Sequence, residues 1–350
     1  MTHQNLEEEP VNNPIGVHMN RTVTRRTAVA AVAAAMLLTT AACNRESPAP
    51  SSDGTAGGPS GAMNIAVVAK GYASPFWATV KAGAEKAGSD LGVGVTFNGP
   101  DNESDINRQV DQLNQAFVRT PSALVFAALD SSASATALDK FKNANIPVVA
   151  FDSGVPGSEV PVSTVATDNK AAAAEAAKKM IELTGGKGKI AIICHSQTSV
   201  TGTDRRDGFQ EYIKANAPDL QIVDIQYNDS DQAKAETQAA AILQANPDLA
   251  GLFATDDDGA VASANAVGRT NRSEVKIIGF DSGKVQIDAI KADKISGSIT
   301  QNPFKMGYLA VETAKKAVEG QSVEKVIDSG FAWYDKTNID TPEIQEAIYE

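Results

Sequence analysis

The stretch Pro147-Val-Val-Ala-Phe-Asp152 is a short apolar run that ends in an aspartate, and it decides how the chain folds. The same form recurs at Thr164-Val-Ala-Thr-Asp168, Phe253-Ala-Thr-Asp256 and Ile277-Ile-Gly-Phe-Asp281. Runs this short, rich in β-branched and aromatic residues and without polar alternation, are typical of strands buried on both faces. Ligands bind beyond the carboxyl ends of parallel strands, so the aspartates also indicate a binding site.

Short apolar runs alternate with longer amphipathic stretches from Asn64 onward. The expected strands are Asn64–Lys70, Val93–Phe97, Ala123–Ala128, Pro147–Asp152, Ser163–Asp168, Lys189–His195, Gln221–Tyr227, Leu249–Thr255, Val275–Asp281 and Gly297–Gln301. The expected helices include Phe76–Asp90, Asp105–Phe117, Ser131–Ala144, Asn169–Leu183, Arg205–Asn216, Asp231–Asn246 and Pro303–Glu319. Regular β-α alternation predicts an α/β fold in which helices cover parallel sheets.

The alternation breaks once, because Pro147–Asp152 and Ser163–Asp168 follow each other without a helix between them. The number of expected strands is also large for one core in about 280 residues. We therefore predict two α/β lobes rather than a single large sheet.

The composition excludes several classes of protein. The chain has 350 residues, three histidines, two cysteines and a formal net charge of −12. Zinc and iron sites draw mainly on His and Cys, and Ser-His-Asp hydrolases need an oriented His. A nucleic-acid surface needs a basic patch. We expect no metal, no cofactor and no nucleic acid.

A basic and then uncharged segment near the start predicts an export signal. Arg21, Arg25 and Arg26 precede the uncharged run Thr27–Ala42. This order is typical of a secretory signal peptide, here residues 1–42, and the run is shorter than the roughly 20 residues of a membrane-spanning helix. An N-terminal anchor helix is the alternative, and translation starts at Met1 or Met19.

Cys43 directly follows small residues and resembles the lipidated cysteine of a bacterial lipobox. Residues 43–62 are rich in Ser, Pro, Gly and Ala, a composition typical of a disordered tether. We therefore expect a lipid on Cys43 that anchors the protein to the outer face of the cell membrane.

The aspartates at the strand ends have two candidate roles. Helix capping fits Asp130 and Asp168, because an expected helix follows each of them directly. Ser-Gly follows Asp152 and Asp281 and delays any helix, so we expect these two aspartates to bind a ligand.

Converging carboxylates without metal ligands suit a sugar, because a hydroxyl group can donate to a carboxylate and accept from Arg or an amide. Arg205, Asn169 and Gln301 supply those donors. Phe76 and Trp77 follow the first strand, and we expect one of them to face a sugar ring and the other to pack in the core.

Taken together, these residues resemble periplasmic binding proteins of the ribose-binding family, the solute receptors of bacterial ABC sugar importers. The resemblance runs from about Asn64 to the end of the sequence. Its motifs are Ser74-Pro-Phe-Trp77, Pro147-Val-Val-Ala-Phe-Asp152, Ala166-Thr-Asp-Asn169, Asp204-Arg-Arg-Asp-Gly-Phe209, Phe253-Ala-Thr-Asp256, Gly279-Phe-Asp281 and Gln301-Asn-Pro303.

The resemblance implies a type I periplasmic binding fold, in which two Rossmann-like lobes are joined by a three-crossing hinge and close on the ligand. The crossings are expected near Thr167–Asn169, Thr300–Asn302 and Gly330–Trp333. The implied domains are residues 63–168 plus 302–331 for the N-terminal lobe and residues 169–301 plus 332–350 for the C-terminal lobe.

The resemblance also implies a function: a monomeric, extracytoplasmic binding protein, not an enzyme, that delivers a sugar or polyol to an ABC permease. Phe76 and Trp77 would stack on the ligand. Its hydroxyl groups would contact Asp152, Arg205, Asp256, Asp281 and Gln301. Ser153 stands where ribose binders often carry Arg, and no aromatic residue lies near Ser230, so another pentose, a hexose, a polyol or a cyclitol fits as well as ribose.

Three other functions use the same residues or fold. A Lac-repressor-type regulator has this fold but carries a helix-turn-helix where this chain has an export signal. A sugar sensor of the same fold that takes no part in transport is a further alternative. An enzyme would use His195 with Asp256-Asp257-Asp258, which we interpret instead as an acidic surface loop.

Three lesser motifs have simpler interpretations. Residues 101–107 are spaced like the start of a calcium loop, but Ile106 stands where Gly is needed, so we predict no calcium site. Gly185-Gly-Lys-Gly-Lys189 precedes a strand and is interpreted as a turn, not a phosphate loop. Cys194 ends an apolar strand and is expected to be buried without a disulfide partner.

Overall fold

A computed structural model describes residues 63–349, which belong to one compact unit. The predicted signal peptide, the tether and Cys43 lie outside the described residues. Within residues 63–349, every helix is too short or too polar to cross a membrane.

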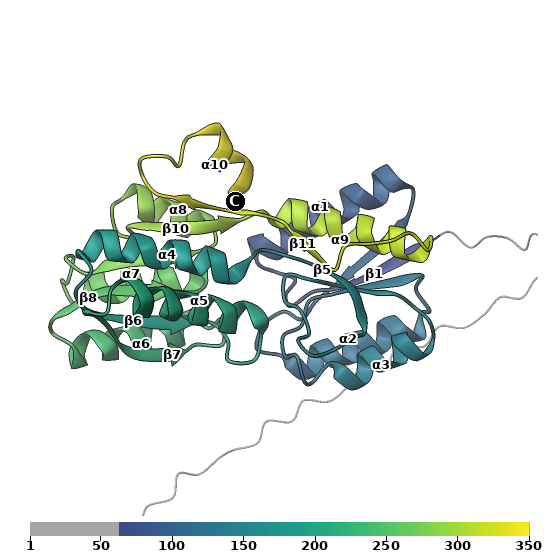
Figure 1. Ribbon diagram of the computed structural model, residues 1–350, viewed down its shortest axis with the longest axis horizontal. Coiled ribbons are helices and arrows are strands. Elements are labelled where there is room, and N and C mark those ends of the chain that lie inside the picture. Colours follow the sequence, from purple (N-terminus) through teal and green to yellow (C-terminus); the bar gives the residue numbers. More distant parts are fainter. Residues whose placement is uncertain (1–62, 350) are drawn as a thin grey trace, which may run out of the picture. The chain divides into compact units, whose positions relative to one another are not determined.

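The first sheet has the strand order β2-β1-β3-β4-β5-β11, and all of its pairings are parallel. Its strands are β1 (Asn64–Val68), β2 (Gly94–Asn98), β3 (Ala123–Phe126), β4 (Val148–Phe151), β5 (Pro161–Ala166) and β11 (Val326–Asp328). Helices α1 (Pro75–Leu91) and α9 (Pro303–Val318) cover one face, and α2 (Ile106–Val118) and α3 (Ala135–Asn143) cover the other (Figure 1). We call this sheet with its helices the first lobe.

The second sheet has the order β7-β6-β8-β9-β10-β12, and only β12 runs antiparallel to its neighbour. Its strands are β6 (Gly188–Cys194), β7 (Leu220–Tyr227), β8 (Leu249–Ala254), β9 (Lys276–Phe280), β10 (Gly297–Gln301) and β12 (Phe331–Tyr334). Helices α4 (Asn169–Thr184) and α5 (Val200–Asn216) cover one face, and α6 (Gln232–Ala245), α7 (Asp257–Arg269) and α8 (Lys284–Lys291) cover the other. These elements form the second lobe, on which α10 (Pro342–Ala347) packs.

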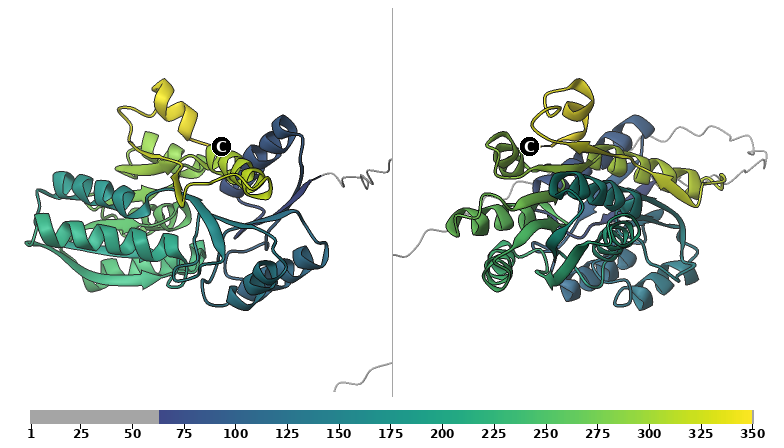
Figure 2. Two further views of the ribbon diagram at one scale, coloured as in Figure 1. Left: turned by 45° about the vertical axis from the view of Figure 1, so that its right-hand side comes forward. Right: turned by 60° about the vertical axis from the view of Figure 1, so that its left-hand side comes forward.

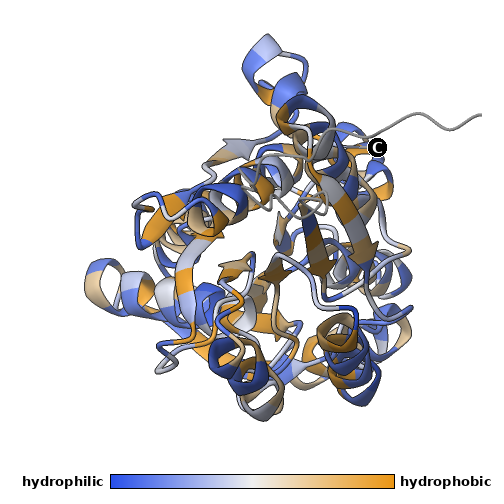
Figure 3. Cartoon of the chain, turned by 90° about the vertical axis from the view of Figure 1, so that its right-hand side faces the viewer, coloured by the Kyte–Doolittle hydropathy of each residue, from blue (hydrophilic) through white to orange (hydrophobic). Residues whose placement is uncertain are grey.

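The cores of both lobes lie between the sheets and their helices. All residues of β3 and β4 are buried, as are the last four of β9. Figure 3 shows strands that are mostly hydrophobic, whereas the helices around them also carry hydrophilic stretches. Burial of one Val, Ile, Leu or Phe side chain contributes about 1.5–3 kcal/mol, so these uninterrupted apolar runs stabilise central strands. The two parallel sheets confirm the predicted α/β fold.

The chain passes between the lobes at three places: after Ala166 of β5, after Gln301 of β10 and after Asp328 of β11. All three lie within or directly beside the predicted crossings. The Thr167 hydroxyl joins them, because it lies 3.0 Å from Gln301 Oε1 and 3.3 Å from Ser329 Oγ. One side chain thus links the three hinge segments.

Close backbone contact fixes α9 on α1 after the second crossing. A Cβ atom on Gly83 would lie 2.0 Å from the Phe304 carbonyl oxygen, and one on Gly307 would lie 2.1 Å from the Val80 carbonyl oxygen. Only glycine permits this approach. Asn302 caps α9 by accepting from the Lys305 backbone N–H at 2.9 Å.

Several local predictions need correction. Asp130 does not cap α3, which starts at Ala135; it accepts instead from the backbone N–H groups of Ser132 and Ala133 in the preceding turn. Helix α5 starts at Val200, five residues before the predicted Arg205. Strands β11 and β12 were not predicted, because both are short and lie at the edges of their sheets.

Other local predictions are confirmed. Asp168 caps α4 by accepting from the Ala171 backbone N–H at 3.0 Å. Gly185 and Gly186 form the turn between α4 and β6 and both adopt positive φ. Cys194 is fully buried and unpaired, and its thiol donates to the carbonyl groups of Ser196 and Gly202. The predicted domain boundaries stay a prediction.

Candidate functional site

A polar cavity lies at the carboxyl ends of the strands of both sheets and has a volume of about 60 Å³. Its lining residues are Lys70, Ser74, Phe76, Trp77, Glu103, Asp152, His195, Arg205, Ser230, Asp256, Asp257, Asp258, Asp281 and Gln301. A second cavity of about 290 Å³ shares four of these residues, and a third of about 580 Å³ shares five. Seven of the eight predicted ligand residues line the cavity, and Asn169 does not.

The first lobe contributes a buried ion pair between Lys70, which follows β1, and Asp152, which follows β4. Lys70 Nζ lies 2.9 Å from Asp152 Oδ2 and 3.7 Å from Glu103 Oε2. Burial opposes the charge of Lys70, but these two carboxylates outweigh it and raise the pKa of Lys70. Lys70 Nζ also donates to Thr201 Oγ1 of the second lobe at 3.1 Å. Lys70 therefore offsets part of the negative charge on the first-lobe side of the cavity, which we call the first wall, and connects it to the second-lobe side, the second wall.

Phe76 and Trp77 form the aromatic part of the same wall. Trp77 is only 1% exposed, packs edge-to-face on Phe151 in the core and donates from Nε1 to Glu103 Oε1 at 2.7 Å. Phe76 is half-buried and contacts Trp77 edge-to-face at 4.9 Å between ring centroids. Trp77 is thus the predicted core member of the pair, and Phe76 offers the more accessible ring.

The second lobe holds Arg205 rigidly. Its Nε donates to Asn169 Oδ1 at 2.7 Å and its Nη1 to the Thr255 carbonyl at 2.8 Å, and the guanidinium lies 3.6 Å from the centre of the Phe280 ring. Arg205 Nη1 also lies 3.7 Å from Asp281 Oδ2. Asn169 therefore orients Arg205, although it does not line the cavity.

Asp152 and Asp281 occupy equivalent places in the two lobes, each directly after a strand with a left-handed backbone. Their φ angles are +52° and +72°. Non-glycine residues adopt this conformation at a cost of order 1–3 kcal/mol and tend to do so at functional sites. Gln301 Nε2 donates to Asp281 Oδ1, while Gln301 Oε1 accepts from Thr167. Both aspartates are nearly fully buried, so a ligand would meet preoriented carboxylates.

The predicted acidic surface loop at Asp256-Asp257-Asp258 is wrong. Asp256 caps α7 by accepting from the Gly259 backbone N–H at 3.0 Å, and the other two aspartates form the first turn of that helix. All three line the cavity. Burial and then their mutual repulsion raise the pKa of Asp256, and burial and the charge of Asp281 raise that of Asp257. A protonated carboxyl can donate as well as accept, which suits a hydroxyl ligand.

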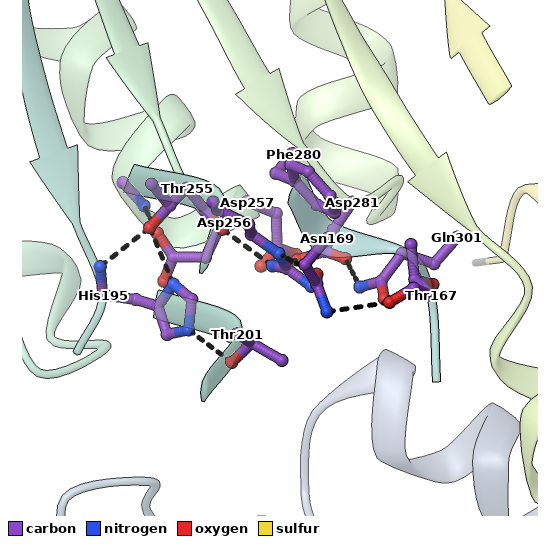
Figure 4. Close-up of polar contacts among 12 residues, drawn as sticks. Thr167, Asn169, His195, Thr201, Thr255, Asp256, Asp257, Phe280, Asp281 and Gln301 are labelled. Carbon is purple, nitrogen blue, oxygen red and sulfur yellow. Dashed lines mark hydrogen bonds and ion pairs between the residues drawn. The ribbon is translucent and has the colours of Figure 1, made fainter. Parts of the chain in front are cut away.

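His195 lies at the end of the second sheet between two hydroxyl groups. Its Nδ1 is 2.7 Å from Thr255 Oγ1 and its Nε2 is 3.0 Å from Thr201 Oγ1 (Figure 4). Burial and then the charges of Arg205 and Lys70 lower the pKa of His195 well below its usual value. The imidazole is therefore neutral at pH 7 and belongs to a hydrogen-bond network in which no carboxylate orients it.

The cavity combines six carboxyl groups with two cations, an amide and two aromatic side chains, Phe76 and Trp77. Such a surface can bind many hydroxyl groups at once. Among residues 63–349, no group of three or more His, Cys, Asp or Glu side chains is arranged to hold a metal ion.

The sequence prediction missed Lys70, Glu103, His195, Asp257 and Asp258. The rule that ligands meet strand ends applies equally to Lys70 and His195, each of which is the last residue of a predicted strand. Asp257 and Asp258 were misassigned because the start of α7 was not predicted. Glu103 comes from the loop before α2, and no strand-end pattern marks it.

Comparison with known proteins gives one family. Residues 65–322 match the model of the periplasmic binding protein domain. The chain is 28% identical over 256 residues to the ribose import binding protein of Bacillus subtilis, which covers 73% of this chain and 82% of that protein.

Solved structures agree with this match. An ABC transporter solute-binding protein from Agrobacterium vitis with bound D-fucose is 35% identical, with a TM-score of 0.79 over 82% of this chain and all of that one. A carbohydrate transporter solute-binding protein from Agrobacterium radiobacter in complex with D-arabinose is 30% identical, with a TM-score of 0.77 over 83% of this chain and 99% of that one.

Proposed function

Because the chain belongs to the periplasmic binding protein domain family, we propose that it is the solute-binding protein of an ABC importer and binds a sugar or polyol between its lobes. The proposed ligand contacts are Phe76, Trp77, Asp152, Arg205, Asp256, Asp281 and Gln301, with Asn169 as the residue that orients Arg205.

The observation that carries the proposal is the network of Arg205 in α5, Asp281 directly after β9 and Gln301 at the end of β10. These side chains are almost fully buried and hold one another in place. A fixed guanidinium beside a fixed carboxylate binds adjacent hydroxyl groups without further reorganisation, which favours affinity. Phe76 opposite them provides a ring face for the C–H surface of a sugar.

Transport follows from the two-lobe arrangement. A ligand that contacts both lobes stabilises the closed form, because those contacts exist together only when the lobes are closed. An ABC permease would recognise that form and accept the sugar. A sensor of the same fold would use the same closure without transport, and a carbohydrate-active enzyme is a weaker alternative because His195 has no carboxylate partner.

The proposed location is extracytoplasmic. The solute-binding proteins to which the chain is similar belong to import systems, and a leader with a lipidated Cys43 would hold the folded part at the outer face of the membrane. We propose a monomer. Mass spectrometry of the protein purified from membranes would detect the lipid; an unmodified Cys43 in the exported protein would contradict the anchor.

A thermal-shift screen followed by calorimetry tests the ligand class. The panel should include ribose, D-fucose, D-arabinose, other hexoses, polyols and cyclitols, with amino acids and nucleosides as controls. We expect one sugar or polyol to raise the melting temperature. Stabilisation by an amino acid or nucleoside alone would contradict the sugar assignment, and turnover of a glycoside would contradict a binding-only function.

A further inference from the structure

An aromatic contact between the two lobes joins Phe76 to Tyr349, a residue outside the predicted ligand set. Tyr349 follows α10, and its ring meets the Phe76 ring edge-to-face with 5.8 Å between centroids. Tyr349 is only 5% exposed. We call residues 342–349 the closing segment, which Figure 2 shows in yellow near the marked end of the chain.

The closing segment belongs to the second lobe. Ile344 lies in the core of that lobe, and Ile348 packs against the same core. The Ala347 carbonyl accepts from Thr300 Oγ1 at 3.0 Å. Phe76, in contrast, packs on the core of the first lobe. The Tyr349–Phe76 contact therefore joins the lobes beside the cavity.

Tyr349 also touches the turn that carries Asp281. Its hydroxyl oxygen accepts from the Ser282 backbone N–H at 3.3 Å. Burial and then the carboxylates of Asp281 and Asp257 raise the pKa of the Tyr349 hydroxyl well above its usual value, so the side chain stays neutral. One ring thus contacts the backbone next to a proposed ligand carboxylate and the proposed stacking residue of the opposite lobe.

The Tyr349–Phe76 contact extends a row of aromatic rings. Tyr349, Phe76, Trp77 and Phe151 meet pairwise edge-to-face, from the closing segment to the core of the first lobe. We propose that Tyr349 is a positioning residue: it fixes the ring of Phe76 against the ligand and holds the lobes closed. Tyr349 is not among the cavity-lining residues, so it acts through Phe76 and not by touching the ligand.

The size of the effect follows from the energy of one aromatic pair. Edge-to-face pairs contribute about 0.5–1.5 kcal/mol beyond their buried area, which corresponds to about twofold to tenfold in an equilibrium. Because this contact forms only when both lobes meet, its loss lowers the closed population and the apparent affinity by the same factor. The association rate, which reflects the open form, should not change.

The test compares Tyr349→Leu with Tyr212→Leu, which removes a half-buried ring from α5 away from the cavity. In a Trp333→Phe background, Trp77 is the only tryptophan of the chain. Without any ligand, we expect acrylamide to quench Trp77 at least twofold faster in Tyr349→Leu than in Tyr212→Leu. Equal quenching in the two variants would overturn the inference.

A second experiment measures the kinetics of ligand binding and rests on the proposed function. It uses stopped flow with D-fucose, D-arabinose and any sugar that the screen identifies. We expect Tyr349→Leu to raise the dissociation rate about twofold to tenfold with an unchanged association rate, and Tyr349→Phe, which keeps the ring, to stay within twofold of the original. A fall in association rate alone would contradict closure by Tyr349.

Two results keep the inference distinct from the proposed function. If no sugar binds the original protein, the proposed function fails, while the quenching comparison still decides the role of Tyr349. If Tyr349→Leu does not fold, Tyr349→Met retains apolar bulk without a ring; we expect the same direction of change, and quenching equal to that of Tyr212→Leu would overturn the proposal.

Discussion

The two walls of the cavity stabilise their buried charges in different ways. In the first lobe, Lys70 faces Asp152 and Glu103, and Trp77 donates to the same Glu103. In the second lobe, Arg205 faces four aspartates and is fixed by neutral groups, the Asn169 amide and the Thr255 carbonyl. The first wall carries one cation for two carboxyl groups and has two aromatic rings, whereas the second wall carries one cation for four carboxyl groups.

This difference indicates that the two walls have different roles in ligand binding. The second wall presents preoriented hydrogen-bonding groups whose supports all come from its own lobe, apart from hinge residue Thr167 behind Gln301. The first wall depends on contact with the second, because Lys70 donates to Thr201. We therefore expect the ligand to bind first to the second wall. The contacts of the first wall should form when the lobes close.

The largest expected effect is that of Arg205→Ala. It leaves Asp281 buried without its cation, and breaking a buried charge pair costs about 3–5 kcal/mol of folding stability. Sugar affinity should fall by about 30-fold or more. Urea unfolding and calorimetry measure the two effects, with exposed Arg269→Ala as the matched control. If Arg205→Ala and Asp281→Ala both retained normal affinity, the site assignment would be wrong.

Lys70→Met should cost less folding stability, about 2–3 kcal/mol, because Arg205→Ala also removes the contacts with Asn169, the Thr255 carbonyl and the Phe280 ring. The variant also loses the bond to Thr201, so ligand-free protein should be more open in small-angle X-ray scattering. Lys70→Met/Asp152→Asn removes the unpaired charge and should recover part of the stability. Equal stability of the single and double variants would show that the two walls do not differ in this way.

Trp77→Phe tests the aromatic wall and should cost about 1–2 kcal/mol. It removes the hydrogen bond to Glu103 and part of the buried ring area. Thermal unfolding measures the loss. Trp333→Phe, at a half-buried site in the second lobe, is the control, and we expect its melting temperature to change less.

The last expected effect is a dependence of folding stability on pH that comes from the acidic second wall. Burial and the charge of Asp281 raise the pKa of Asp257 to about 8 in the folded state, whereas an unfolded aspartate titrates near 4. The folded state therefore binds more protons in this window, and stability from this group is lost as pH rises from about 4 to about 8.

Asp257→Asn removes that dependence. Its melting temperature should exceed that of the original protein by about 5 °C or more at pH 8 and match it near pH 4. The pKa of His195 is lowered, so its contribution to stability changes in the opposite direction at acidic pH. Because His195 is present in both proteins, that contribution cancels in the comparison. Exposed Asp139→Asn on α3 is the control, and an equal gain there would contradict the burial argument.

Much of the fold could be predicted because burial on both faces imposes uninterrupted apolar runs such as Val148–Phe151 and Ile277–Phe280. Strand β11 has three residues, two of them exposed, so no such run marks it. Asp168 was predicted correctly as a cap, whereas Asp130 was not, because four residues with short side chains separate it from α3 and Ser134 takes the cap position.

The candidate site was predicted where one strand end carries one cavity-lining residue, as at Asp152 and Asp281. Contacts that depend on two lobes could not be read from the sequence. Lys70 and Thr201 are 131 residues apart, and Tyr349 reaches Phe76 through a helix that packs on another sheet. Only the folded chain brings these residues together.

The burial of Cys194 has a practical consequence. Its thiol donates to two carbonyl groups inside the second lobe and is shielded from solvent. Burial raises its pKa, which further lowers its reactivity toward alkylating dyes. A cysteine introduced at the exposed rim, for example at Tyr72, could therefore be labelled selectively once Cys43 is replaced by Ser. Residues 63–349 are in this respect suited to conversion into a fluorescent sugar sensor.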